Sequence, residues 1–241
     1  MTQATIVNPA LVSKLALRII VAGGGSAQDE RPLLELFAAW TGSKGKVLFL
    51  PIAQAGMGRP LEGCLAWGKA TLQTVGVNDV TMWTDLSSES HSSLADFSSI
   101  FISGGNTFFL LDQVRKSGFD TALRQFATQG GVIYGSSAGA ILLGQDILTC
   151  AHLDENRVGL DDSRGLNLVS GLSVWCHYQL EDDKCIVEYM TRNGLPVLAL
   201  SERSGVCLNG IELTVQGHEP TYVFTANGKR TVNVGEAVLP R

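Results

Sequence analysis

The chain has 241 residues, of which 45% are hydrophobic and only 17% are charged, so it can bury a large core and has little room for a disordered arm. Its net charge is −5, and it contains no lysine and arginine cluster that could follow a phosphate backbone, which excludes nucleic acid as an expected partner. No apolar run reaches the roughly 20 residues that span a bilayer, and residues 1–14 lack a basic segment followed by an apolar one. We therefore expect a cytoplasmic protein with no membrane partner.

The cysteine pattern points to a reducing compartment. The five cysteines are odd in number and scattered, and no two of them have Cys-x-x-Cys spacing. They are typical of reduced packing residues rather than of a disulfide framework or a zinc site. The sequence predicts no metal centre.

Apolar runs alternate with amphipathic stretches through the first half of the chain. Strands are predicted near residues 17–22, 46–52, 80–83, 99–103 and 131–134, and helices at residues 31–40, 61–75 and 107–116. Nearly continuous strands of valine, isoleucine and leucine that are separated by helices are typical of a mostly parallel sheet covered on both faces. The pattern predicts the α/β class.

The second half of the chain changes character. Residues 152–170 are polar and contain glycine, which predicts a loop or hairpin, and the next elements are a strand at 172–177, a helix at 182–191 and a strand at 196–201. From residue 205, short alternating segments joined by two Asn-Gly turns predict antiparallel strands that extend one edge of the sheet. We predict a single α/β domain over residues 1–241, with an N-terminal extension at 1–16 and antiparallel strands in 205–241.

A serine stands at the apex of a predicted strand-to-helix turn. The apolar strand ends in Gly135, and Ser137 holds the central place of a Gly-x-Ser-x-Gly elbow that ends at Gly139. Such an elbow raises the central side chain above the sheet, and it places the N–H of Ala138 where it could stabilise an oxyanion. The same five residues also occur in tight packing turns, but the flanking strand and helix favour a nucleophile.

Two further glycine-bearing loops are predicted at the carboxyl ends of strands, where open α/β sheets bind ligands. The loop at 23–26 suggests a dinucleotide site, but that fingerprint requires glycine where Gln28 stands, so we predict no cofactor. The loop at 103–106 precedes a helix, and Asn106 could simply cap it. Beside a serine elbow, the backbone of Gly105 is instead a candidate second oxyanion donor.

A serine nucleophile needs a base and an acid that orients the base. His177 ends a predicted strand downstream of the elbow and is the best of four histidines, with His152 as second choice. Glu202 ends the next strand, and strand-end acids of parallel sheets converge on one edge. The alternatives to these catalytic roles are that His177 is an ordinary histidine at a strand end and that Glu202 forms a surface salt bridge. Glu181 and Asp182 lie nearer to His177 in sequence, but they are suited to charging the N-terminus of the next helix.

Four segments together resemble the serine peptidase family of aspartyl dipeptidase (peptidase E) and cyanophycinase. The segments are Ile102-Ser103-Gly104-Gly105-Asn106-Thr107-Phe108, Tyr134-Gly135-Ser136-Ser137-Ala138-Gly139-Ala140, His177-Tyr178 and Leu198-Ala199-Leu200-Ser201-Glu202. The likeness extends over residues 17–224 and implies a flavodoxin-like fold, related to class I glutamine amidotransferases, with a Ser-His-Glu triad. Carried over by motif, it implies Ser137 as nucleophile, His177 as base, Glu202 as orienting acid, and the N–H groups of Gly105 and Ala138 as oxyanion donors.

The segment after the histidine departs from the family pattern. Aspartyl dipeptidases carry a longer segment with basic residues there, whereas residues 177–184 are short and acidic, which counts against aspartate specificity. Acidic side chains would favour an amino terminus or a basic side chain of the substrate. The candidates for substrate binding are Gly104, Asn106, Ser136, Glu181 and Asp182.

These observations predict a serine exopeptidase, acting as a dipeptidase, that hydrolyses short peptides through an acyl-enzyme. One alternative keeps the site but takes β-aspartyl-arginine material, as a cyanophycinase does. The other is a non-catalytic, amidotransferase-like domain that binds a small molecule. Folds of this kind commonly dimerise, so a homodimer is left open.

Overall fold

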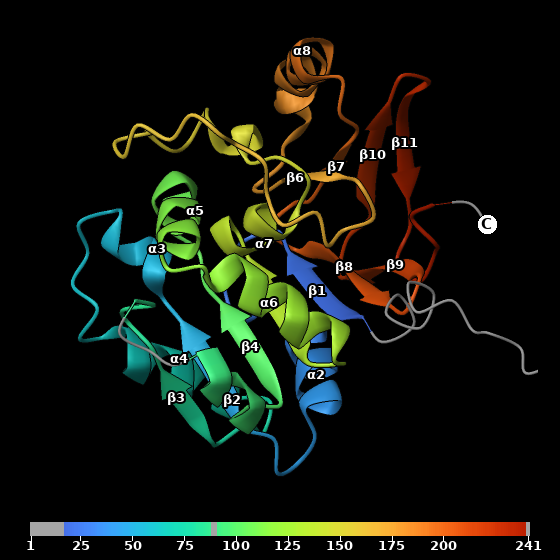
Figure 1. Ribbon diagram of the computed structural model, residues 1–241. Helices are drawn as coiled ribbons and strands as arrows, with labels where there is room; N and C mark the ends of the chain where they lie inside the picture. Colours follow the sequence, from blue (N-terminus) through green and yellow to red (C-terminus); the bar gives the residue numbers. More distant parts are fainter. Residues whose placement is uncertain (1–16, 88–90, 240–241) are drawn as a thin grey trace, which may run out of the picture.

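A seven-stranded sheet forms the centre of the protein (Figure 1). The computed structural model describes residues 17–87 and 91–239, and the predicted extension at residues 1–16 lies outside them. The strand order is β3-β2-β4-β5-β1-β8-β9, and the five strands from β3 to β1 run parallel. The strands are β1 (Arg18–Ala22), β2 (Val47–Leu50), β3 (Val80–Met82), β4 (Ser99–Ile102), β5 (Val132–Ser136), β8 (Ser204–Asn209) and β9 (Glu212–Gly217).

A second, four-stranded sheet has the order β11-β10-β7-β6. It consists of β6 (Ser173–Trp175), β7 (Val197–Ala199), β10 (Thr221–Thr225) and β11 (Gly228–Val232). The sequence predicted one antiparallel extension of one sheet, but the structure divides the tail: β8 and β9 extend the main sheet beside β1, and β10 pairs with β7 instead. The reason is a separate core, in which Phe224 of β10 packs with Trp175, Tyr178 and Tyr189.

Helices cover both faces of the main sheet, as the sequence predicted. Side chains of β1 alternate, so that Ile20 packs in one core with α2 while Ile19 and Val21 face a core with α5, α6 and α7. The helices are α2 (Arg31–Thr41), α3 (Ile52–Ala55), α4 (Cys64–Gln73), α5 (Thr107–Lys116), α6 (Phe119–Thr128), α7 (Ala138–Leu143) and α8 (Asp183–Asn193), with short 3₁₀ turns η1 (His91–Asp96), η2 (Leu148–Cys150) and η3 (Leu180–Asp182). No helix formed by residues 17–87 and 91–239 is both long and apolar enough to cross a membrane.

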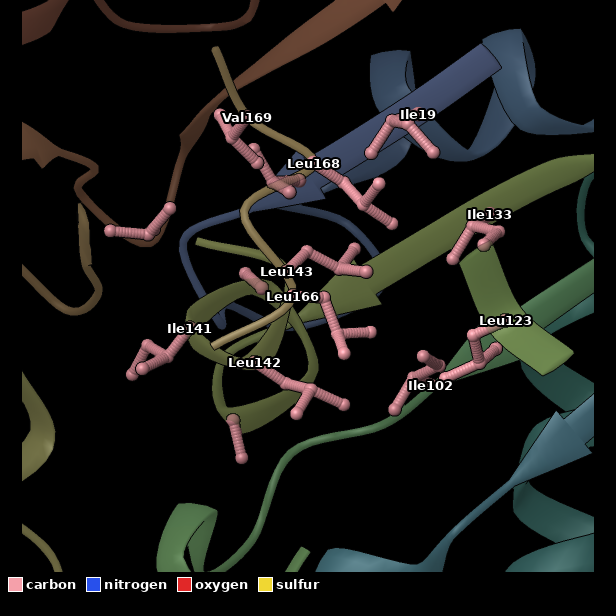
Figure 2. Close-up of a cluster of buried hydrophobic side chains, with 14 of the residues drawn as sticks. Ile19, Ile102, Leu123, Ile133, Ile141, Leu142, Leu143, Leu166, Leu168 and Val169 are labelled. Carbon is pink, nitrogen blue, oxygen red and sulfur yellow. The ribbon is translucent and has the colours of Figure 1, made fainter. Parts of the chain in front are cut away.

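The short helix α7 is held inside the core. Figure 2 shows Leu142 and Leu143 of α7 among Ile19, Ile133 and Leu166, and every residue of this helix is buried. Its last carbonyl groups accept hydrogen bonds from the crossing segment at residues 165–169, as when the N–H of Leu166 donates to Leu142. Buried carbonyl groups at a helix end need such partners. The helix that follows the serine is therefore held by the packing of its side chains and by the hydrogen bonds at its C-terminal end.

Candidate active site

Ser137 occupies a strained turn between β5 and α7. Its backbone has φ 52° and ψ −115°, a conformation that non-glycine residues rarely adopt and that persists only where the surroundings enforce it. Both neighbouring glycines are required by close packing. A Cβ atom on Gly135 would lie 2.5 Å from the Gly139 carbonyl oxygen, and one on Gly139 would lie 2.3 Å from the Ile102 carbonyl oxygen. The elbow predicted from the sequence is thus formed by tight contact of strand and helix.

Three polar side chains form a hydrogen-bonded line at the carboxyl end of the strands. Ser137 Oγ lies 2.9 Å from His177 Nε2, and His177 Nδ1 lies 3.0 Å from Glu202 Oε1. His177 follows β6, and Glu202 lies in the turn after β7, so the smaller sheet supplies the base and the acid while the main sheet supplies the serine. The His177 side chain is 31% exposed and that of Glu202 is 59% exposed, so the line runs from the half-buried serine outward to solvent.

The loop after β1 passes between these groups, and this explains its three consecutive glycines. A Cβ atom on Gly23 would lie 1.8 Å from the Ser201 carbonyl oxygen, and one on Gly25 would lie 2.3 Å from the carbonyl oxygen of Glu202. A Cβ atom on Gly24 would lie 2.6 Å from His177 Nε2. The sequence had suggested a weak nucleotide fingerprint here. The structure instead uses the glycines to let the backbone approach the serine, the histidine and the glutamate.

The second glycine loop lies against the serine. A Cβ atom on Gly104 would lie 3.3 Å from Ser137 Oγ. Gly105 has φ +139°, and a Cβ atom there would lie 2.3 Å from the Ala53 carbonyl oxygen. Asn106 is buried and begins α5: its Oδ1 accepts the N–H of Phe109 at 2.9 Å. Asn106 is thus the helix cap that the sequence had offered as an alternative, and its Nδ2 also donates to the Glu155 carbonyl oxygen at 3.0 Å.

The remaining candidates lie in different places. The Ser136 hydroxyl borders the cleft at Ser137 but donates to Glu30 Oε1 at 2.7 Å. Neither Glu181 nor Asp182 lines that cleft; Asp182 Oδ2 accepts the N–H of Gln179 at 2.8 Å, so it caps the η3 turn. His152, the second choice for the base, stacks on Trp175 with ring centroids 4.2 Å apart.

Glu30 is a buried carboxyl group behind the elbow that the sequence reasoning missed. It is 4% exposed, and its oxygens accept hydrogen bonds from the Gly24 N–H at 3.0 Å, the Ser136 hydroxyl at 2.7 Å and the Tyr134 hydroxyl at 2.8 Å. Burial raises the pKa of Glu30 to about 7, and the three hydrogen bonds act in the opposite direction. Glu30 therefore connects the glycine loop to the residue before Ser137. Its only sequence signal was an acid shortly before a predicted helix.

The match to a family model settles what kind of protein carries this site. Residues 19–216 match the model of peptidase family S51. The chain belongs to peptidase family S51. The resemblance drawn from the four motif segments is thereby confirmed, and the S51 chain is a peptidase of the serine type.

Relatives of this S51 peptidase carry peptidase names. A Drosophila melanogaster protein named probable alpha-aspartyl dipeptidase is 28% identical over 193 residues, covering 76% of this chain and 77% of that protein. An uncharacterized peptidase of Listeria monocytogenes serovar 1/2a is 27% identical over 155 residues, 61% of this chain and 74% of that one.

Solved structures show the same fold. The crystal structure of a peptidase from an acI-B1 Actinobacterium has a TM-score of 0.68 at 16% identity and covers 94% of this chain and 98% of its own. A candidate peptidase E protein from Listeria monocytogenes EGD-e has a TM-score of 0.67 at 23% identity, covering 84% and 99%. The predicted α/β fold with a mostly parallel sheet is confirmed.

A cleft of about 410 Å³ opens above Ser137 in the S51 peptidase. Its walls include Arg59, Trp67 and Asp154, and Asp154 Oδ2 accepts the N–H of Thr107 at 2.7 Å. A second cavity of about 390 Å³ shares Arg59 and Trp67 with the cleft and extends toward Phe49. Among the described residues, no group of three or more histidine, cysteine, aspartate or glutamate side chains is arranged to hold a metal ion.

Proposed function

We propose that this chain is a serine exopeptidase that hydrolyses short peptides through an acyl-enzyme, with Ser137, His177 and Glu202 as its catalytic triad. The observation that carries the proposal is the hydrogen-bonded line of these three side chains, 2.9 Å and 3.0 Å long at its two links, beside a cleft. Serine and histidine within hydrogen-bond reach, with the histidine held by a carboxylate, is the arrangement that activates a serine nucleophile.

The proposed reaction has two halves. Ser137 Oγ attacks the scissile carbonyl carbon while His177 Nε2 takes the hydroxyl proton, and the C–N bond then breaks as His177 returns that proton to the leaving amine. A water molecule next attacks the acyl-serine ester, gives a proton to His177, and releases the acid as the proton returns to Ser137. Glu202 keeps the other ring nitrogen protonated, so Nε2 is free to accept.

The negative oxygen of each tetrahedral intermediate needs donors beside Ser137. The N–H groups of Gly105 and Ala138 are the proposed donors, because Ala138 begins the helix after the serine and the Gly104–Gly105 loop borders Ser137 Oγ. A donor of this kind can contribute roughly 10²- to 10³-fold to the rate. The positive φ of Gly105 fixes the direction of its peptide groups.

Dipeptides are the proposed substrate class. A cleft of about 410 Å³ suits a small ligand, and the relative from Drosophila melanogaster is named an alpha-aspartyl dipeptidase. The short acidic segment after His177 had favoured β-aspartyl-arginine material. That argument loses its basis, because Glu181 and Asp182 do not line the cleft.

The test of the proposed function is Ser137→Ala. Turnover of dipeptides should fall by several orders of magnitude, as triad knockouts do, roughly 10⁶-fold in the best-studied case. A fluorophosphonate probe should label the unaltered protein at Ser137 in a 1:1 ratio and leave the variant unlabelled. A folded protein that the probe never labels would instead support the non-catalytic binding domain, and a variant with near-normal peptidase activity would refute the triad.

A further inference from the structure

A buried carboxyl group lies behind the strained turn at Ser137. Glu30 is 4% exposed, and in residues 17–87 and 91–239 no lysine, arginine or histidine forms an ion pair with it. Acidic side chains are almost never fully buried unless they are paired. Helix capping does not account for this one, because Glu30 precedes α2 but its side chain makes no hydrogen bond to the first turn of that helix. Its partners lie instead around the proposed triad.

One peptide group connects Glu30 to His177. The peptide between Gly23 and Gly24 donates its N–H to Glu30 Oε1 at 3.0 Å, and its carbonyl oxygen accepts the N–H of His177 at 3.0 Å. A peptide group is planar, so a partner that fixes its N–H also fixes the direction of its carbonyl group. His177 needs this support, because its φ of 55° is a conformation that non-glycine residues rarely adopt. Glu30 thus helps to hold the backbone of the proposed base.

The same carboxyl oxygen also reaches the serine side of the site. Glu30 Oε1 accepts the hydroxyl of Ser136 at 2.7 Å, and Ser136 directly precedes Ser137. Gly24 borders both reacting side chains, since a Cβ atom there would lie 2.6 Å from His177 Nε2 and 2.8 Å from Ser137 Cβ. One oxygen atom of Glu30 therefore holds both the loop beside the histidine and the residue before the serine.

The hydrogen bonds of Glu30 suit an ionised carboxylate. Its second oxygen, Oε2, accepts the hydroxyl of Tyr134 at 2.8 Å, so both oxygens already have donors. An ionised carboxylate only accepts hydrogen bonds, whereas a protonated one adds a hydrogen that must compete with these donors. Hydrogen bonds to a charged acceptor are also roughly twice as strong as those between neutral groups. Loss of the charge would therefore weaken the link from Glu30 to the loop after β1.

Two titratable side chains of the described residues face Glu30 from the elements packed against it. They are the Tyr134 hydroxyl of β5 and the thiol of Cys176, which precedes His177. Burial raises the pKa of both groups well above their ordinary values, so both stay neutral around pH 7. Burial also raises the pKa of Glu30 to about 7. Glu30 is therefore the member of this cluster whose charge changes near neutral pH.

We propose that Glu30 is a positioning residue for Ser137 and His177 and that the pair reacts fastest when Glu30 carries its negative charge. This inference rests on the proposed peptidase function. The charged carboxylate holds the loop after β1 and the Ser136 hydroxyl, and these keep the proposed base and nucleophile at hydrogen-bond distance. Ionisation of Glu30 is less favourable in the folded chain than in the unfolded one, so reactivity should rise with pH while the free energy of unfolding falls.

The test compares the unaltered protein with Glu30→Gln. Glutamine keeps an acceptor oxygen and stays neutral at every pH, so it imitates protonated Glu30. The rate of fluorophosphonate labelling at Ser137 is measured from about pH 5.5 to 9, and the unaltered rate is divided by the variant rate at each pH. Protonation of His177 lowers both rates and cancels in the ratio. The ratio should lie within about twofold of one at pH 5.5 and rise to about tenfold at pH 9, with its midpoint at about pH 7.

Tyr134→Phe tests the carboxyl group without altering it. This variant removes one donor to the charged form, so the pKa of Glu30 should rise by about one unit. The unaltered rate divided by the Tyr134→Phe rate should therefore pass through a maximum of about threefold near pH 7 and return to about one at pH 9. The result decides the question even if Glu30→Gln does not fold.

Glu35→Gln is the matched control. Glu35 lies in α2, pairs with Arg31 at 2.7 Å and has a side chain that is 56% exposed. The substitution removes the same charge at the surface, so its ratio should stay within about twofold of one at every pH.

A Glu30→Gln ratio that is the same at every pH would overturn the inference, because a purely structural role lowers the rate without following the charge of Glu30. A ratio that falls as the pH rises, or a Tyr134→Phe ratio without a maximum, would also overturn it. Failure of the proposed function looks different: the probe then labels Ser137 in none of the folded proteins at any pH, and the role of Glu30 falls with it.

Discussion

Replacing Gly24 by alanine should separate His177 from Ser137, the proposed nucleophile, without removing any functional group. The new Cβ atom would lie 2.5 Å from His177 Cε1, 2.6 Å from His177 Nε2 and 2.8 Å from Ser137 Cβ. Carbon atoms in contact prefer about 3.5 Å, so the ring or the loop must move by about 1 Å. A displacement of this size from a productive geometry can cost about 10²-fold in rate.

A matched variant separates this effect from backbone strain. Gly24 has φ +101° and Gly228 has φ +104°, but a Cβ atom on Gly228 would meet nothing within 4 Å. The backbone strain of an alanine at either position should lower the free energy of unfolding by a similar amount, roughly 1–3 kcal/mol. Urea denaturation should therefore show a comparable decrease in both variants. Any larger decrease in Gly24→Ala would come from the close contacts of its Cβ atom.

Only Gly24→Ala should lose reactivity. The assay is the rate of fluorophosphonate labelling at Ser137, followed by the kcat of dipeptide hydrolysis, and both should fall about 10²-fold relative to Gly228→Ala. A folded Gly24→Ala protein that is labelled as fast as Gly228→Ala would refute the argument. It would mean that the contact of Ser137 with His177 tolerates a 1 Å shift or does not control the reaction.

The other predictions concern Glu30 and Asn106. Burial raises the pKa of Glu30 to about 7 in the fold, from an ordinary value of about 4.5, so the folded state holds this proton more tightly than the unfolded state does. The free energy of unfolding should therefore fall by about 3 kcal/mol as the pH rises from about 4.5 through 7. Urea titrations at pH 4.5, 6 and 8 should show this fall in the unaltered protein and not in Glu30→Gln. Asn106→Ala should lower the free energy of unfolding by about 0.5–2 kcal/mol through loss of the α5 cap and leave the KM for dipeptides near its original value; a raised KM at unchanged stability would indicate substrate contact instead.

The sequence predicted most of the fold because its signals are local. Buried strands such as β2 and β4 are short apolar runs, and the helix at residues 107–116 agrees with α5 residue for residue. The ends of a helix are predicted less accurately where no side chain caps it. The helix expected at residues 61–75 is α4, which begins after Gly63 and ends at Gln73. Hydrophobic periodicity marks the buried part of an element better than its ends.

The division of the tail into two sheets could not be predicted. Alternating residues show that residues 221–225 form a strand, but they do not show whether its partner is β9 or β7. The choice depends on which side chains bury together, and the ring of Phe224 finds its core with Trp175 and Tyr189. Strand pairing across many residues is a property of the packed chain.

For the site, the sequence by itself determined the elbow, because strand, turn and helix are contiguous and the two glycines that permit their contact stand within five residues. It also indicated which strand-end histidine and glutamate could join the serine. Only the tertiary structure decided that Ser137 Oγ and His177 Nε2, forty positions apart, lie 2.9 Å from each other. It alone placed Glu30 behind the elbow and joined it to His177 through the peptide group between Gly23 and Gly24, because burial and hydrogen-bond partners depend on groups that approach from distant parts of the chain.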